Sequence, residues 1–229
     1  MKRLLVHVEG SSEETFIKEL VAPYLYLHGY SSVSPRLLGN SRQRTKRGGA
    51  RSWQGVKKEI IRHMMEDKGC YSTTMVDFYG LPAQGEGAWP GRAAADQALP
   101  HTKASMVEQA IAMDICEFLA VEPDVCRFIP FLVMHEFEGL LFSDCHKLAI
   151  CIGRRDIETQ LQAVRDSFGS PEEINDSPNT APSKRVLSLF PGYQKVIMGN
   201  IAAIEIGLDT IRAQCPHFSD WISKLESLT

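Results

Sequence analysis

The chain has 229 residues, of which 44% are hydrophobic and 23% charged, so it can form one large domain or two small ones around an apolar core. No apolar run approaches the ~18 residues of a membrane helix, and the start is not a signal peptide, because its apolar stretch is interrupted by His7 and ends at Glu9. The six cysteines include no Cys-x-x-Cys pair. We therefore expect a cytoplasmic protein with no membrane contact, reduced thiols, no disulfides and no zinc.

Strand and helix patterns alternate from the first residues onward. Gly10 and Ser11 form a turn, after which Ser12 caps a helix that Pro23 bends or ends. Apolar or β-branched runs predict strands, and apolar residues at helical spacing predict helices. In chain order, we expect a strand over 4–8, a helix from about 12, a strand over 33–38, a helix over 53–65, a strand over 72–78, a long surface loop over 80–100, a helix over 106–119 and a strand over 127–134.

The rest of the chain, from Phe137, has mainly helical patterns. Strands that alternate with helices predict an α/β fold, with a mostly parallel central sheet and helices on both of its faces. We predict a single domain over 1–229, with a core at about 1–145 and a helical C-terminal extension at about 146–229.

Carboxylates follow three of the predicted strands. Glu9 ends the first strand, Asp77 ends the third, and Glu136 and Glu138 follow the fourth. Ligands of parallel sheets bind at the carboxyl ends of the strands, and clustered carboxylates must bind either protons or a cation. We therefore predict a site for Mg²⁺ or Mn²⁺, in which Glu9, Asp77 and Glu136 act in catalysis. Its predicted metal ligands are Glu9, Glu13, Asp77, Glu136 and Glu138.

Each of these residues also has a structural interpretation. A carboxylate at a strand end is more often a helix cap or a surface ion pair. Glu13 either points back at the site or only stabilises the first turn of its helix. His135 either transfers protons near neutral pH or is a hydrogen-bonded histidine at a strand end.

The net charge of −3 hides an uneven distribution, since residues 36–62 hold nine Lys or Arg and one acid. This basic stretch either grips the phosphates of a nucleic acid or is a solvated loop. The residues after Pro182 either form a second phosphate clamp or belong to a helix start and to surface packing. Trp53 and Trp89 either stack on bases or belong to the core. The predicted nucleic-acid contacts are Arg42, Arg44, Lys46, Arg47, Arg51, Lys184 and Arg185, and Tyr193 and Lys195 extend the second clamp.

Five motifs together resemble a known family. The opening 8–14, VEGSSEE, resembles TOPRIM-type domains, in which a Glu ends the first strand and a glycine follows it. The motifs at 74–82 and 134–144, and those at 182–185 and 215–221, resemble a bacterial TOPRIM-like family of unknown function, domain family 4276, which is related to the TOPRIM domains of OLD-type nucleases. The resemblance implies a TOPRIM-like fold and, for family relatives, a separate ATPase partner in prokaryotic antiviral defence.

The chain departs from the TOPRIM pattern at one position. The pattern has Asp-x-Asp, whereas this chain has Asp77-Phe78-Tyr79, so Glu136 or Glu138 would have to replace the second acid. Our first hypothesis is a metal-dependent nuclease that cleaves DNA or RNA. The second is a non-catalytic TOPRIM-like module that binds nucleic acid or an ATPase partner, and the third is a phosphoryl-transfer enzyme for a small nucleotide.

Overall fold

The computed structural model describes residues 2–39, 52–175 and 180–228. Within these residues, five strands form a sheet in the order β2-β1-β3-β4, and β5 also pairs with β3. Every pairing is parallel, which confirms the predicted α/β fold with a mostly parallel central sheet. The strands are β1 (Lys2–Val8), β2 (Tyr30–Leu37), β3 (Cys70–Asp77), β4 (Phe128–Ile129) and β5 (Leu132–Val133).

The strand predicted over 127–134 is interrupted at Pro130, between β4 and β5. Proline has no backbone N–H to donate to the sheet, so regular pairing fails there. The side chain of Thr74 bridges the interruption, because its Oγ1 donates to the Phe131 carbonyl at 2.9 Å and accepts from the Phe131 N–H at 3.0 Å. Both short strands therefore remain beside β3, and β5 directs the chain to the carboxyl edge of the sheet.

The connection from β1 to β2 comprises α1 (Ser11–Phe16), a π-helical turn η1 (Ile17–Val21) and α2 (Ala22–Leu27). The predicted cap at Ser12 is wrong: Gly10 holds the N-cap position without a side-chain hydrogen bond, and Ser12 is buried inside α1. Pro23 does not end the helical segment, because it lies in the first turn of α2, where a missing N–H costs little. Glu13 lies in the first turn of α1, four residues after Glu9.

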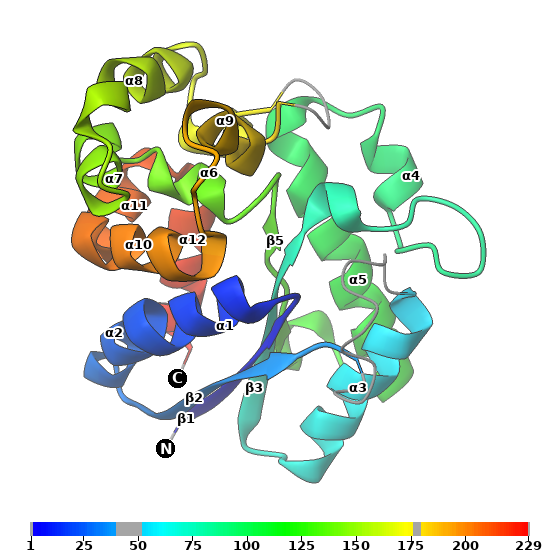
Figure 1. The fold of residues 1–229 in the computed structure, drawn as a ribbon. Coiled ribbons are helices and arrows are strands. Elements are labelled where there is room, and N and C mark those ends of the chain that lie inside the picture. The colour runs from blue at the N-terminus through cyan, green and yellow to red at the C-terminus, as the bar shows by residue number, and fades with distance from the viewer. Residues whose placement is uncertain (1, 40–51, 176–179, 229) are drawn as a thin grey trace.

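Helices cover both faces of the sheet, as predicted (Figure 1). On one face lie α3 (Trp53–Glu66) and α5 (Lys103–Leu119), whose apolar residues form one core cluster with Val76 and Leu132. The expected surface loop over 80–100 is more ordered than predicted. It follows the 3-10 turn η3 (Phe78–Gly80), contains α4 (Arg92–Ala95) and leads into η4 (Pro100–Thr102), and its Trp89 is buried.

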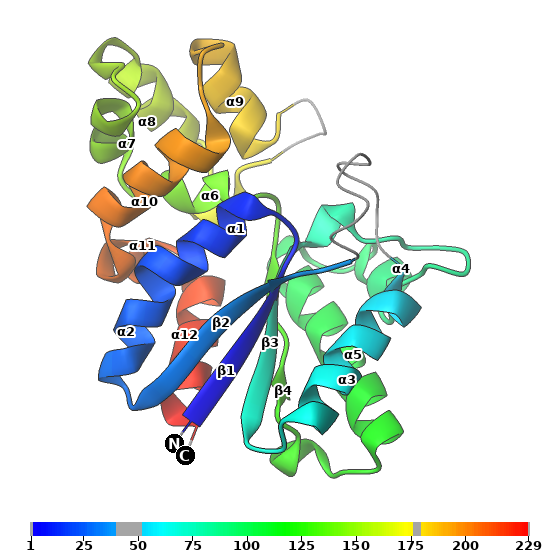
Figure 2. The same ribbon diagram turned by 60° about the horizontal axis from the view of Figure 1, so that its bottom comes forward.

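The other face carries α1, α2 and the C-terminal helices (Figure 2). These helices share a second core cluster with the apolar residues of β1, and Trp221 stacks on Phe131 with ring centroids 4.4 Å apart. No helix in the described ranges is long and apolar enough to cross a membrane. The C-terminal elements are α6 (Glu138–Leu141), α7 (Cys145–Cys151), η6 (Arg155–Ile157), α8 (Glu158–Asp166), η7 (Pro171–Glu173), α9 (Pro182–Leu189), η8 (Lys195–Gly199), α10 (Asn200–Ile206), α11 (Leu208–Gln214) and α12 (Pro216–Ser227).

Candidate carboxylate site

Glu9 and Asp77 lie side by side at the carboxyl edge of the sheet. Their strands are parallel neighbours, with Val8 paired to Met75, so the chain leaves both strands at the same edge. The backbone N–H of Asp77 donates to Glu9 Oε2 at 3.4 Å. The η3 turn then curls back, because a Cβ placed on Gly80 would lie 3.8 Å from the same Glu9 oxygen.

The carboxylate of Asp77 is in an unfavourable environment for its charge. Its Oδ1 is shielded from solvent and has no hydrogen-bond partner among the described residues. Burial, followed by the charges of Glu9 and Glu13, raises the pKa of Asp77 well above its ordinary value, and Lys195 only partly opposes this rise. A buried acid with these neighbours gains more from a nearby cation than an exposed one does.

Lys195 lies among the acids rather than in a phosphate clamp. Its Nζ is 2.9 Å from Glu138 Oε2, an ion-pair distance, and 3.9 Å from Glu13 Oε1. Glu138 is fully buried and Glu13 nearly so. Burial alone would lower the pKa of Lys195, but the carboxylates of Glu138 and Glu13 outweigh it and raise that pKa. The protonated amine therefore neutralises the inner part of the acid group.

Tyr193, two residues before Lys195, lies close to the Glu138 carboxylate. Its side chain is buried, and the pKa of its hydroxyl is raised by burial and by the Glu138 carboxylate. Gly199 gives the hydroxyl its space, because a Cβ on that glycine would lie 2.6 Å from the Tyr193 oxygen. In the sequence, Tyr193 lies 55 residues after Glu138 and 116 residues after Asp77. The short π-helical turn η8 that carries Lys195 has no sequence pattern that would have placed it at this site.

Glu136 lies close enough to Asp77 for its charge to act there, and it also accepts a hydrogen bond from the start of α9. Its Oε2 accepts from the backbone N–H of Ser183, at 2.8 Å, in the first turn of α9. An acid at a helix N-terminus is a favourable cap. The charge of Glu136 nevertheless reaches Asp77 and Glu138 and raises the pKa of both, although burial is the larger cause in each case.

His135 and the residues of the second phosphate clamp differ in their exposure and in their contacts. His135 is half-buried and lies with its Nδ1 3.1 Å from the side-chain nitrogen of Asn175. Lys184 is exposed on α9, whereas Arg185 donates from Nε to the Thr180 carbonyl at 2.8 Å and lies over the Phe168 ring. Lys184 is thus available to a ligand, and Arg185 is held by protein contacts.

Two further predictions concern residues 40–51 and the tryptophans. The basic residues Arg42, Arg44, Lys46, Arg47 and Arg51 lie outside the described residues, so their predicted role stays a prediction. Trp53 and Trp89 pack together with ring centroids 4.8 Å apart and are both buried. Their core interpretation is confirmed, and neither ring can stack on a base.

The acids do not form a complete set of metal ligands by themselves. Within residues 2–39, 52–175 and 180–228, no group of three or more His, Cys, Asp or Glu side chains is arranged to hold a metal ion. The adjacent pair is Glu9 and Asp77, while Glu13 and Glu138 contact Lys195. The arrangement therefore offers an ion about two protein carboxylates.

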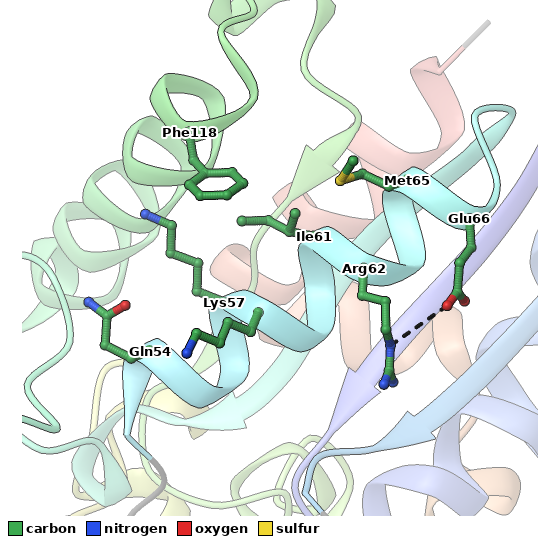
Figure 3. Close-up of a pocket in the computed structure, with 8 residues that line it drawn as sticks. Gln54, Lys57, Ile61, Arg62, Met65, Glu66 and Phe118 are labelled. Atoms are coloured by element: carbon green, nitrogen blue, oxygen red, sulfur yellow. Dashed lines mark ion pairs between the residues drawn. The ribbon is translucent and has the colours of Figure 1, made fainter.

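A separate groove of about 550 Å³ lies on the outer side of α3 (Figure 3). Its floor includes Ile61 and the exposed side chains of Met65 and Phe118, and its rim includes Lys57 and Arg62. None of the five acids lines it. The groove is therefore distinct from the carboxylate site.

The fold and the acid-lined sheet edge define an α/β protein with a candidate polar site at the carboxyl ends of its strands. The family model named Domain of unknown function (DUF4276) matches residues 8–226. The chain therefore belongs to this family, which confirms the resemblance found in its motifs.

Comparison with solved structures finds C-terminal regions of OLD proteins. That of the Burkholderia pseudomallei OLD protein has 14% sequence identity and a TM-score of 0.46, with 99% of this chain and 100% of that chain covered. That of the Xanthomonas campestris pv. campestris OLD protein has 13% identity and a TM-score of 0.41, with 96% of both chains covered. Comparison with curated proteins gives no match.

Proposed function

We propose that the protein is a metal-dependent nuclease that hydrolyses phosphodiester bonds of DNA or RNA with Mg²⁺ or Mn²⁺. The observation that supports this most strongly is the adjacency of Glu9 and Asp77 at the carboxyl edge of a parallel sheet. The shielded Asp77 Oδ1 adds to it, because a buried carboxylate oxygen without a hydrogen-bond donor is a favourable ligand for a cation.

The donor set fits Mg²⁺ better than a metal that needs a full protein cage. Mg²⁺ is commonly held by one or two carboxylates, and it keeps water molecules and binds substrate phosphates in its other positions. Glu9 and Asp77 can supply these two carboxylates. A bound ion would stabilise the charge that develops on the phosphate and activate a water molecule for attack.

The other residues hold this pair in place. The positive charge of Lys195 lies next to Glu138 and Glu13. It therefore reduces the repulsion among the five acids. Glu136 ties the chain after β5 to α9, which keeps its charge close to Asp77. In this proposal, His135 lies beside Glu136 as a group that can accept a proton near neutral pH.

The proposed substrate is held by cations at the rim of the site. Lys184 is exposed on α9, and the basic residues of 40–51 are a proposed second grip on phosphates. We further propose that a separate ATPase subunit controls the nuclease within an antiviral defence system in the cytoplasm. The motif resemblance supports this partner.

One observation favours a non-catalytic module as the second candidate. Lys195 already places a cation against Glu138 and Glu13, and the second acid of the TOPRIM pattern is replaced by Tyr79. A module of this kind would bind nucleic acid or an ATPase partner without cleaving. It would show no increase in melting temperature with Mg²⁺ or Mn²⁺.

The variant Glu9→Gln tests the first candidate. A neutral amide preserves the shape of the side chain but removes the charge that a divalent ion needs, so we expect cleavage of DNA and RNA oligonucleotides to be lost with the fold intact. Glu14→Gln is the matched control, because it removes the same charge one position after Glu13, from a residue that pairs with Lys18 at 2.6 Å. Equal cleavage by wild type and Glu9→Gln, in preparations free of contaminating nuclease, would refute the proposal.

A further inference from the structure

Tyr79 and His135 form a parallel stack beside the carboxylate site. Their ring centroids are 4.9 Å apart and their planes differ by 10°. Tyr79 lies in the η3 turn between Asp77 and Gly80, and His135 directly precedes Glu136. The stack therefore joins the two turns that carry acids from β3 and β5.

The Tyr79 ring is held in position yet remains accessible. Phe78 contacts it edge-on with centroids 5.1 Å apart, and the Arg92 guanidinium lies 5.7 Å from its centroid. Phe78 itself is completely buried, whereas 48% of Tyr79 is exposed. An aromatic side chain that is fixed by its neighbours loses little conformational freedom when a ligand packs on it.

Arg92 explains why the turn is rigid. Its side chain is buried, donates from Nε to the Phe78 carbonyl at 3.2 Å, and lies 4.1 Å from the Phe78 ring centroid. It also pairs with Asp96, the residue that follows α4. The polar and aromatic contacts of Arg92 thus fix the backbone that carries both Asp77 and Tyr79.

We propose that Tyr79, backed by His135, is a base-stacking residue that makes the site specific for single-stranded nucleic acid. This inference rests on the proposed nuclease function and extends it to the class of substrate. A base in a duplex has its faces covered by neighbouring base pairs, whereas an unpaired base can stack on an aromatic ring. Tyr79 is two residues from Asp77, so it contacts a base that flanks the bond to be cleaved.

Stacking of this kind is tolerant of sequence, because every base has an aromatic face. The second acid of the TOPRIM pattern would have supplied a metal ligand at this position, whereas the tyrosine supplies a surface for the base. On this account Tyr79 is a specificity-determining residue, and it takes no part in holding the ion.

Binding measurements with Tyr79→Leu and Tyr79→Phe test the proposal. The probes are short fluorescein-labelled oligothymidylate and oligouridylate, the same strands with abasic sugars in place of the bases, and a duplex, all in Ca²⁺ to limit cleavage. Tyr26→Leu is the matched control, since Tyr26 on α2 is also 48% exposed. Loss of one stacked base weakens binding by about 5- to 150-fold.

We expect Tyr79→Leu to lose about this factor for the strands with bases and to bind abasic strands as wild type does. Tyr79→Phe and Tyr26→Leu should bind every probe like wild type. If Tyr79→Leu binds all probes like wild type, or loses affinity equally for strands with and without bases, the inference is wrong. Equal loss would show that the stack only braces the two turns.

A second readout uses the wild-type protein, in case Tyr79→Leu does not fold. Fluorescence of 2-aminopurine in a single strand should fall on binding, because the base stacks on a ring, and an unchanged signal in the bound complex would contradict the inference. These results are separate from the nuclease test. Base-dependent binding in Ca²⁺ together with no cleavage in Mg²⁺ or Mn²⁺ would support the stacking residue and refute the nuclease. Cleavage in Mg²⁺ or Mn²⁺ together with base-independent binding would support the nuclease and refute the stacking residue.

Discussion

At the scale of single residues, Asp77 has a shielded oxygen without a hydrogen-bond partner among the described residues. Burial, and then the charges of the nearby Glu9, Glu13 and Glu136, raise its pKa. An asparagine in its place would keep the shape of the side chain and remove the repulsion. We predict that, without added metal, Asp77→Asn raises the free energy of unfolding by about 0.5–2 kcal/mol, as relief of functional strain often does. Thermal unfolding in EDTA measures this gain.

The gain from Asp77→Asn should depend on pH. The folded-state pKa of Asp77 lies above the ~3.9 of an unfolded aspartate. Between these two values only the folded state holds the proton, so wild-type stability rises as pH falls through the raised pKa. The advantage of the variant is therefore complete above the raised pKa of Asp77 and disappears as pH approaches ~3.9. A gain that is absent at every pH, or that grows as pH falls, would contradict the prediction.

The residues of the site differed in how well the sequence predicted them. Glu9 and Asp77 were found because each ends a predicted strand, and strand order alone brings such residues to one edge. Lys195 was placed with the phosphate clamp because a short turn late in the chain carries no sign of its packing partners. Glu136 was expected to face the site, and its contact with Ser183 depends on where α9 begins.

At the scale of elements, the segment after β3 depends on the close approach of α4 to α5. Gly91 has a φ of +75°, and a Cβ there would lie 2.9 Å from the Ala110 Cβ in α5. Gly85, in the same segment, has a φ of +77°, but a Cβ there would meet nothing within 4 Å. An alanine at either position would be strained by the positive φ. Only at Gly91 would its Cβ also lie too close to a neighbouring helix.

We predict that Gly85→Ala costs about 1–2 kcal/mol, the cost of the left-handed conformation, and that Gly91→Ala costs a further 1–3 kcal/mol or so from overpacking. Gly91→Ala should also disturb Arg92 and, through it, the η3 turn. Chemical denaturation of both variants measures the difference in unfolding free energy. Equal costs for the two substitutions would show that α4 can move away from α5 without loss.

The elements themselves were predicted unevenly. The helices at 53–65 and 106–119 were found because their apolar residues recur at helical spacing, and the structure extends them only slightly. The loop at 80–100 was expected at the surface because proline and glycine interrupt every pattern in it. Trp89 is buried against Trp53, which lies 36 residues earlier in the chain. Local sequence patterns carry no information about a tertiary contact of this kind.

At the scale of the whole molecule, the two helical layers are connected at the edge of β5. Glu108 of α5 accepts from the Leu132 N–H at 2.7 Å, and its carboxylate lies 2.8 Å from His217 Nε2 of α12. This contact joins helices on opposite faces of the sheet, a pairing that no sequence pattern predicted. The division into a core at about 1–145 and an extension at about 146–229 stays a prediction, although the C-terminal helices share a core cluster with β1.

In the proposed function, Glu9 and Asp77 hold one divalent ion at the carboxyl edge of the sheet. The most direct measurement is a crystal structure of the protein soaked in Mn²⁺, with anomalous scattering used to locate the ion. We expect an anomalous peak coordinated by Glu9 and Asp77, with water in other positions, and no such peak in Asp77→Asn. An ordered site without a peak there, or a peak that persists unchanged in Asp77→Asn, would contradict it.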